Sequence, residues 1–249
     1  MNLRVLTSLT LSVAMLLSAL SACSILPGNL HAPADPAALY EQSISDAAVA
    51  SPAKVRPLLP IPATDTVQIV SWVSASNDLC AGADLPCKYT VNNGGMFVTL
   101  AGEVQGKCHA WGLSGDALRI RLEQLLGLPP NQAEKYLKSR FVVLETVREN
   151  LQRPCLGLDV HAGNVQCAMT IPNTPSKEIS PLAFVGEQMA RDYVTGTSGA
   201  PGYPFTRLGY TYDWNPDSVN HYGASELILA QGAVAVVQAQ MTTDAYCSK

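Results

Sequence analysis

The chain of 249 residues carries 16 Lys and Arg against 20 Asp and Glu, a formal net charge of −4, and 47% of its residues are hydrophobic. This balance argues against nucleic-acid binding and against electrostatic binding to an anionic lipid surface, because both need clustered positive charge. A chain of this length is expected to form one large domain, or a tether and a smaller domain, and to bury roughly 70% of the surface that the unfolded chain exposes.

The first 23 residues have the form of an export signal. Arg4 precedes an apolar run from Leu9 to Leu20, and small residues then lead directly to Cys23. The run is too short to span a bilayer and has the flanks of a signal peptide. It resembles the signal and lipobox of bacterial lipoproteins, which implies cleavage before Cys23 and acylation of that residue with diacylglycerol and a further chain such as palmitate.

The same resemblance implies an address. Ser24, rather than Asp, follows Cys23, which in enterobacterial-type sorting implies export to the outer membrane, on its periplasmic or its outer side. Two acyl chains hold a protein stably at a bilayer, whereas one does not. The expected partners are therefore the membrane, through the lipid, and an envelope protein or cell-wall polymer.

The segment that follows Cys23 is rich in Pro and Ala, with seven prolines between residues 24 and 65. This composition predicts a semi-extended tether that holds the domain away from the bilayer. Within it, Asp35-Pro36 is a possible start for a short helix to about Ala48. We therefore divide the chain into a signal peptide (1–22), a lipidated cysteine with a tether (23–65) and a single globular domain (66–249).

Six cysteines remain after Cys23. In an oxidising compartment an even number favours disulfides, and proximity in sequence suggests the partners. A zinc site is the alternative, but the cysteine and histidine spacings match no tight ligand pattern. We expect three pairs, the first two closing polar loops and the third pinning the last strand: Cys80–Cys87, Cys155–Cys167 and Cys108–Cys247.

In the first part of the domain, β-branched and aromatic residues predict strands, and a leucine repeat predicts one strong helix. Ser114 is expected to cap this helix, and Gly127 with two following prolines ends it. A long turn-rich connection occupies residues 75–94. The expected elements are strands at Val67–Val73, Met96–Leu100 and Arg140–Val147, and a helix at residues 114–126.

A second helix is expected from Ser180-Pro181 to about Val194. Three strands then follow with short connections: Phe205–Trp214, Ala224–Ala230 and Ala233–Gln240. Short connections between successive strands predict an antiparallel three-stranded meander. The fold class is therefore α+β, with a mainly antiparallel sheet, two packed helices and disulfide staples.

The densest group of aromatic and polar side chains lies between residues 203 and 226. If residues 206–214 form a strand, Arg207 and Asp213 share a face, and His221 returns near Asp213 across the next turn. Stacking surfaces with a few fixed polar groups suit a sugar or another small polar ligand. The alternative is that the aromatic residues are the buried face of a strand. The candidate ligand-binding residues are Arg207, Tyr210, Tyr212, Asp213, Trp214, His221 and Glu226.

Motifs for catalysis are weak. Ser114, between Gly112 and Asp116, faintly resembles a nucleophile elbow, and Ser114, Asp213 and His221 follow the order of a hydrolase triad. Asp116 stands where that motif has glycine, however, and a helix cap explains Ser114 without catalysis. No phosphate, dinucleotide or metal motif indicates a cofactor.

Cys108 and His109 are adjacent and suggest a thiol–imidazole pair. On the strand that we expect there, neighbouring residues point to opposite faces, so a disulfide explains Cys108 better. Asp159 and His161, which lie in the loop between Cys155 and Cys167, are expected to form an ordinary polar pair.

Three functional hypotheses follow. The first is a non-enzymatic outer-membrane lipoprotein that binds a protein partner or an envelope polymer. The second is an envelope hydrolase that acts on peptidoglycan or another glycan through Asp213, Glu226 or His221. The third is a subunit of a secretion or surface assembly.

The lipoprotein assignment is tested by metabolic labelling with an alkyne analogue of palmitate in cells that express the full chain. We expect label on the wild-type protein and none after Cys23→Ser, because the thiol that accepts diacylglycerol is lost. The neighbouring Ser24→Ala variant is the control and should keep the label. Equal labelling of the Cys23→Ser variant would contradict acylation at this position.

Overall fold

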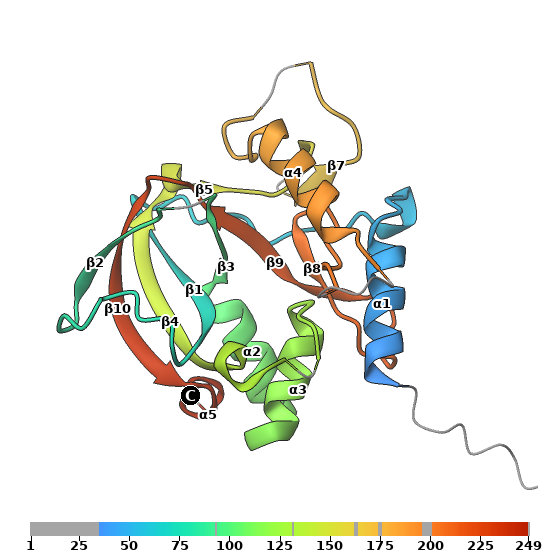
Figure 1. Ribbon diagram of the computed structural model, residues 1–249. Coiled ribbons are helices and arrows are strands. Elements are labelled where there is room, and N and C mark those ends of the chain that lie inside the picture. Colours follow the sequence, from blue (N-terminus) through green and yellow to red (C-terminus); the bar gives the residue numbers. More distant parts are fainter. Residues whose placement is uncertain are drawn as a thin grey trace, which may run out of the picture. The chain divides into compact units, whose positions relative to one another are not determined.

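The computed structural model describes residues 35–248, except residues 93, 131, 162–163, 174–175 and 196–200. The described chain forms an eight-stranded antiparallel sheet, a separate two-stranded hairpin and five α-helices (Figure 1). The α+β class with a mainly antiparallel sheet is therefore confirmed. None of the described helices is both long and apolar enough to cross a bilayer.

The elements have the following bounds. The strands are β1 (Thr66–Ser74), β2 (Cys87–Thr90), β3 (Met96–Leu100), β4 (Lys138–Val147), β5 (Leu151–Gln152), β6 (Gly157–His161), β7 (Asn164–Ala168), β8 (Tyr210–Tyr212), β9 (Tyr222–Leu229) and β10 (Val234–Thr242). The α-helices are α1 (Pro36–Ala47), α2 (Ala101–Trp111), α3 (Gly115–Leu125), α4 (Leu182–Asp192) and α5 (Thr243–Cys247), and three 3₁₀ turns lie at Pro52–Lys54, Glu134–Tyr136 and Arg148–Asn150.

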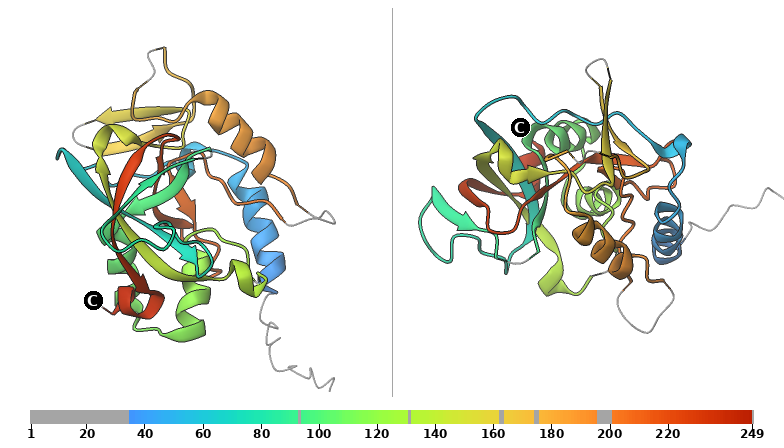
Figure 2. Two further views of the ribbon diagram at one scale, coloured as in Figure 1. Left: turned by 60° about the vertical axis from the view of Figure 1, so that its left-hand side comes forward. Right: turned by 90° about the horizontal axis from the view of Figure 1, so that it is seen from above.

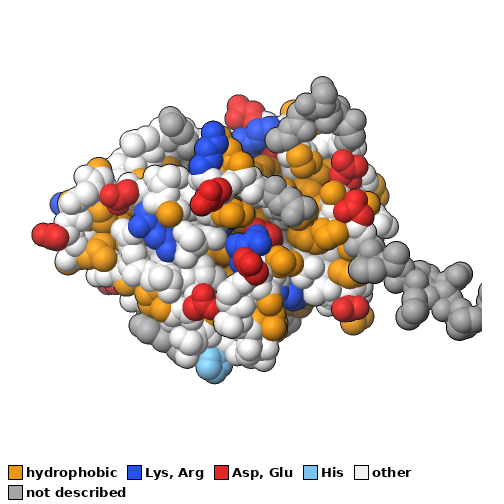
Figure 3. Space-filling view, turned by 60° about the horizontal axis from the view of Figure 1, so that its bottom comes forward, with side chains coloured by type: hydrophobic (Ala, Val, Ile, Leu, Met, Phe, Trp, Pro, Cys, Tyr) orange, Lys and Arg blue, Asp and Glu red, His pale blue; other side chains and the backbone are white. Residues whose placement is uncertain are grey.

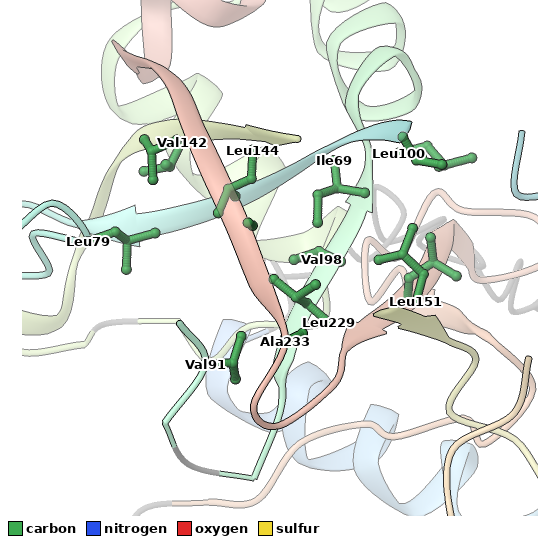
Figure 4. Packing of buried hydrophobic residues seen from close by; sticks show 14 of the residues in the cluster. Ile69, Leu79, Val91, Val98, Leu100, Val142, Leu144, Leu151, Leu229 and Ala233 are labelled. Atoms are coloured by element: carbon green, nitrogen blue, oxygen red, sulfur yellow. The ribbon is translucent and has the colours of Figure 1, made fainter. Parts of the chain in front are cut away.

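The main sheet has the order β2-β10-β4-β1-β3-β9-β5, and β8 pairs with β9. β9 and β10 follow each other through a short turn at residues 230–233, although β3, β1 and β4 lie between them in this order. The sheet therefore curls so that distant strands approach at one end (Figures 1 and 2). The inside of the curl holds a core to which β1, β3, β4, β9 and β10 all contribute (Figure 4).

β1 is apolar on both faces, as expected of a central strand. Ile69 belongs to the core inside the curl, whereas Val70 and Trp72 belong to a second core on the outer face. α2, α3 and α5 cover that outer face, and the rings of Trp72, Phe141 and Tyr246 stack there in sequence, with centroids 5.8 Å and 4.0 Å apart. These three helices lie below the sheet in Figure 1.

Most elements expected from the sequence are present, and the structure adds α2, α5, β2 and the strands β5, β6 and β7. α2 was not expected, and Cys108 and His109 lie on this helix rather than on a strand. The sequence did not reveal the helix because its apolar pattern is weak: only Val104 and Cys108 are buried. β2 lies within the segment expected as a turn-rich connection. Ser114 takes the N-cap position of α3, but its side chain makes no capping hydrogen bond.

The C-terminal strands have the expected sequence order but differ in pairing. The strand expected at Phe205–Trp214 is reduced to β8, because Arg207 and Gly209 adopt left-handed backbone angles, with φ of 48° and 74°. β8 pairs with β9 in antiparallel register. β10 pairs with β4 and β2 instead of completing a meander with β9.

The packed body begins before the expected domain boundary at residue 66. Asp35 caps α1 by accepting a hydrogen bond from the main-chain N–H of Ala37, and Tyr40 and Ile44 are buried. α1 packs in a cluster with Tyr212 and Trp214. Residues 35–65 are therefore part of the globular unit, which corrects the expectation that they form a free tether.

The structure contains the three disulfides expected from the sequence. Cys80–Cys87 and Cys155–Cys167 span 7 and 12 residues, whereas Cys108–Cys247 spans 139 residues and joins α2 to α5. Because the entropy lost by the unfolded chain grows with loop size, the long-range bridge should stabilise the fold most.

We expect the double variant Cys108→Ser/Cys247→Ser to lower the free energy of unfolding by about 4–5 kcal/mol. Cys80→Ser/Cys87→Ser, the control with a short loop, should lower it by roughly 2–3 kcal/mol. Urea unfolding of each variant measures the difference. A smaller loss for the long-range pair would contradict this ranking.

Candidate functional site

The seven candidate ligand-binding residues do not form one site. Asp213 is buried and accepts two hydrogen bonds from Arg121 on α3, at 3.0 and 2.7 Å. The ring of His221 stacks on Tyr212 and its Nδ1 lies 2.8 Å from the main-chain oxygen of Asp213. His221 therefore does return beside Asp213, but the carboxylate already has a cationic partner.

The aromatic candidates have structural contacts, as the alternative interpretation holds. The hydroxyls of Tyr210 and Tyr212 donate to the main-chain oxygen of Lys54 and to Asp46, and the indole N–H of Trp214 donates to Leu128 O. All three rings are buried. Arg207 does not lie with Asp213; it points to Tyr193, with a 3.4 Å contact between Nη1 and the hydroxyl.

A triad of Ser114, Asp213 and His221 is not assembled. Ser114 is exposed at the start of α3, seven residues before the Arg121 that holds Asp213, which is about 10 Å along a helix. Cys108 is in a disulfide and is not a thiol. No cluster of three metal-ligating side chains occurs among the described residues.

The structure instead presents a pocket of about 580 Å³ on the outer face of the sheet. Its floor comes from β1, β3, β4 and β9, and its walls come from the end of α4 and two loops. The volume lies within the range of small-molecule sites. The residues that matter most for its chemistry are Trp72, Phe97 and Phe141 on the apolar floor, and Glu226, Asp192, Arg191, Lys138 and Tyr203 as ionisable groups.

Glu226 is the central polar group of the pocket. It lies on β9 opposite Thr99 of β3. Its neighbour Leu227 belongs to the core inside the curl and Ala224, two residues before it, to the outer core, so the side chain of Glu226 points to the outer face. Its carboxyl makes no hydrogen bond or ion pair with any described residue and opens into the pocket. Burial, reinforced by the negative charge of Asp192, raises the pKa of Glu226 to about 8. Glu226 is therefore mainly protonated at neutral pH.

Asp192 supplies a second carboxyl at the same end. It is buried at the last residue of α4 and accepts a 3.0 Å hydrogen bond from Nε of Arg191. Burial raises the pKa of Asp192, and Arg191 partly offsets this effect. Burial and the charge of Asp192 likewise raise the pKa of Tyr203. This end of the pocket therefore combines two carboxyls with one guanidinium.

Lys138 lies in another part of the pocket. Its ammonium has no hydrogen-bond or ion-pair partner among the described residues, and burial alone lowers its pKa. The strand order places Lys138, on β4, three strand spacings from Glu226, on β9. The pocket thus has a basic part and an acidic part joined by an apolar floor.

Of the seven candidates, Tyr212 and Glu226 line this pocket. Glu226 carried a usable signal, because it is the single charged residue in the apolar run from Ala224 to Ala230. Lys138 and Asp192 were missed because they lie at the ends of predicted elements, where charged residues are common. Their proximity to the pocket follows from packing, not from sequence spacing.

Comparison with protein-family models, with curated proteins and with solved structures found no match.

The protonated state of Glu226 has a measurable consequence. Its pKa rises from 4.5 to about 8 on folding, so between these values the folded protein retains a proton that the unfolded chain releases. The contribution of Glu226 to stability therefore falls as the pH rises through this interval, by up to about 1.4 kcal/mol per pH unit. We expect Glu226→Gln to flatten the fall in the free energy of unfolding between pH 5 and 8.

Urea unfolding across this pH range measures the effect. Glu187→Gln, on the exposed surface of the neighbouring helix α4, is the matched control and should leave the profile unchanged. A Glu226→Gln profile that is parallel to the wild-type profile would show that the pKa of Glu226 is not raised.

Proposed function

We propose that the protein is a lipid-anchored component of the bacterial cell envelope whose domain binds a small molecule in the pocket around Glu226. The observation that carries the binding role is a partly open, largely apolar pocket that contains a carboxyl with no protein partner among the described residues. A buried polar group without a partner is costly, and a ligand that hydrogen-bonds with it recovers that free energy. The lipobox resemblance supports the envelope location.

A binding role is better supported than an extended docking surface. On the face shown in Figure 3, acidic, basic and hydrophobic side chains are interspersed rather than gathered into one field. The exposed large hydrophobic residues also come from many separate elements and loops. The pocket is the place where apolar surface and unpaired polar groups converge.

Hydrolysis is the second candidate, and one observation favours it. Glu226 holds a proton at neutral pH beside Asp192, and a protonated and an ionised carboxyl in one pocket are the groups that glycoside hydrolysis uses. Asp213 and His221, which we expected to take part, are not in the pocket. A hydrolytic role would therefore depend on Glu226 and Asp192.

The proposal is tested by equilibrium dialysis of the full-length acylated protein, held in lipid nanodiscs, against the water-soluble fraction of an envelope extract. Mass spectrometry then identifies small molecules that the protein enriches. We expect enrichment by the wild-type protein and by Glu187→Gln, and a loss of at least tenfold in Thr99→Trp, because the larger side chain fills the pocket beside Glu226.

The outcomes separate the candidates. No enrichment by the wild-type protein, or equal enrichment by a folded Thr99→Trp variant, would contradict the binding role. Release of cleaved products that stops in both Glu226→Gln and Asp192→Asn would favour the hydrolase. Thermal unfolding of each variant checks that the fold is intact.

A further inference from the structure

The two polar parts of the pocket define the shape and charge of the molecule that it can hold. Lys138 and Glu226 line the same pocket from β4 and β9. With β1 and β3 between them, they are three strand spacings apart, which is about 14 Å. Lys138 also lies five residues along β4 from Val143, the residue level with Glu226 in the register, which adds about 16 Å along the strands. The two residues are therefore on the order of 20 Å apart along the sheet. A ligand that contacts both must be elongated.

The Lys138 part is suited to an anion. A half-buried ammonium without a partner is unfavourable, and a carboxylate is the group that best compensates it. The pKa of Glu226 responds to Asp192, whereas no carboxylate affects the pKa of Lys138. The acidic residues of the pocket therefore do not neutralise Lys138, and an incoming anion has no protein carboxylate to displace.

The Glu226 part is suited to a cation. Arg191 already pairs with Asp192, but its side chain is largely exposed, and no basic residue contacts the carboxyl of Glu226 among the described residues. One of the two carboxyls, that of Asp192, therefore has a cationic partner, whereas that of Glu226 has none among the described residues. An ammonium group placed here would let Glu226 ionise and would pair with it, while aromatic rings nearby favour cations further.

We propose that the pocket binds an elongated zwitterion, with an ammonium group at Glu226 and Asp192 and a carboxylate at Lys138. A short peptide of about six residues is the simplest molecule of this class, because an extended chain rises about 3.3 Å per residue. The apolar floor formed by Trp72, Phe97 and Phe141 contacts the middle of the ligand. This inference rests on the proposed binding function and specifies its ligand.

Binding of such a ligand is coupled to a proton. The charged and titratable groups that line the acidic part are Asp192 and Arg191 from α4, Tyr203 from the following loop and Tyr212 from β8. Of these, Asp192 is the group that raises the pKa of Glu226 together with burial. Because Glu226 is mainly protonated at pH 7, an arriving ammonium should release about one proton as Glu226 ionises.

The test is isothermal titration calorimetry of the full-length acylated protein in nanodiscs, with hexa-L-alanine as the probe. Its N-acetyl and C-amide derivatives each lack one charge, and 16-aminohexadecanoic acid has both charges without peptide bonds. We expect hexa-L-alanine to bind at least about tenfold more tightly than either capped peptide. Buffers with different ionisation enthalpies report the released proton.

Variants assign each charge to its residue. Glu226→Gln should abolish the preference for a free amino group and the proton release, but keep the preference for a free carboxylate. Lys138→Met should do the reverse. The controls are Glu187→Gln and Lys135→Met, which replace like residues outside the pocket and should keep both preferences.

The remaining outcomes are decisive. Equal binding of free and capped peptides, or binding of none of the probes, would overturn the zwitterion inference. The binding function would still stand if the dialysis experiment yields a ligand, and would fall only if that experiment also yields none. Binding of 16-aminohexadecanoic acid without binding of hexa-L-alanine would keep the zwitterion but exclude a peptide.

Discussion

The structure depends on one constraint: β1, at the centre of the sheet, is apolar on both faces. Ile69 and Val73 face one side, and Val70 and Trp72 face the other, so neither side can remain in water. The sheet curls, so that the face with Ile69 and Val73 is buried in the core inside the curl. The face with Val70 and Trp72 needs a separate cover, and α2, α3 and α5 provide it over part of the outer face.

The pocket lies where that helical cover ends. Beyond α3, the outer face is covered by the end of α4 and by the loops at residues 126–128 and 203–205. These walls are supported from behind by α1, since the hydroxyl of Tyr40 donates to the main-chain oxygen of Gly202 at 2.9 Å and contacts that of Gly127 at 3.4 Å. Figure 2, seen from above, shows α4 between the curled sheet and α1. The cover is therefore rigidly held but incomplete.

The sequence was sufficient for the elements with strong periodicity and insufficient for the site. β1, β3, β4, β9 and α3 follow from local pattern, and cysteine spacing suggested the three disulfides. α2 was missed because Gly102 and Gly106 leave it little apolar surface. The strand expected from Phe205 was predicted too long at its start, because composition does not reveal that the backbone of Arg207 has a left-handed conformation. The pocket brings together residues from four strands and a helix, and no local pattern encodes such long-range packing.

The early start of the packed body also sets a length scale. For a protein held by lipid at Cys23, only twelve peptide links lead to Asp35, where the folded unit begins. Even when fully extended, at about 3.6 Å per link, this segment reaches at most on the order of 40 Å. A tether that continued to residue 65 would have reached roughly 150 Å. If Cys23 carries the lipid that we propose, the pocket can bind only molecules that pass close to the bilayer.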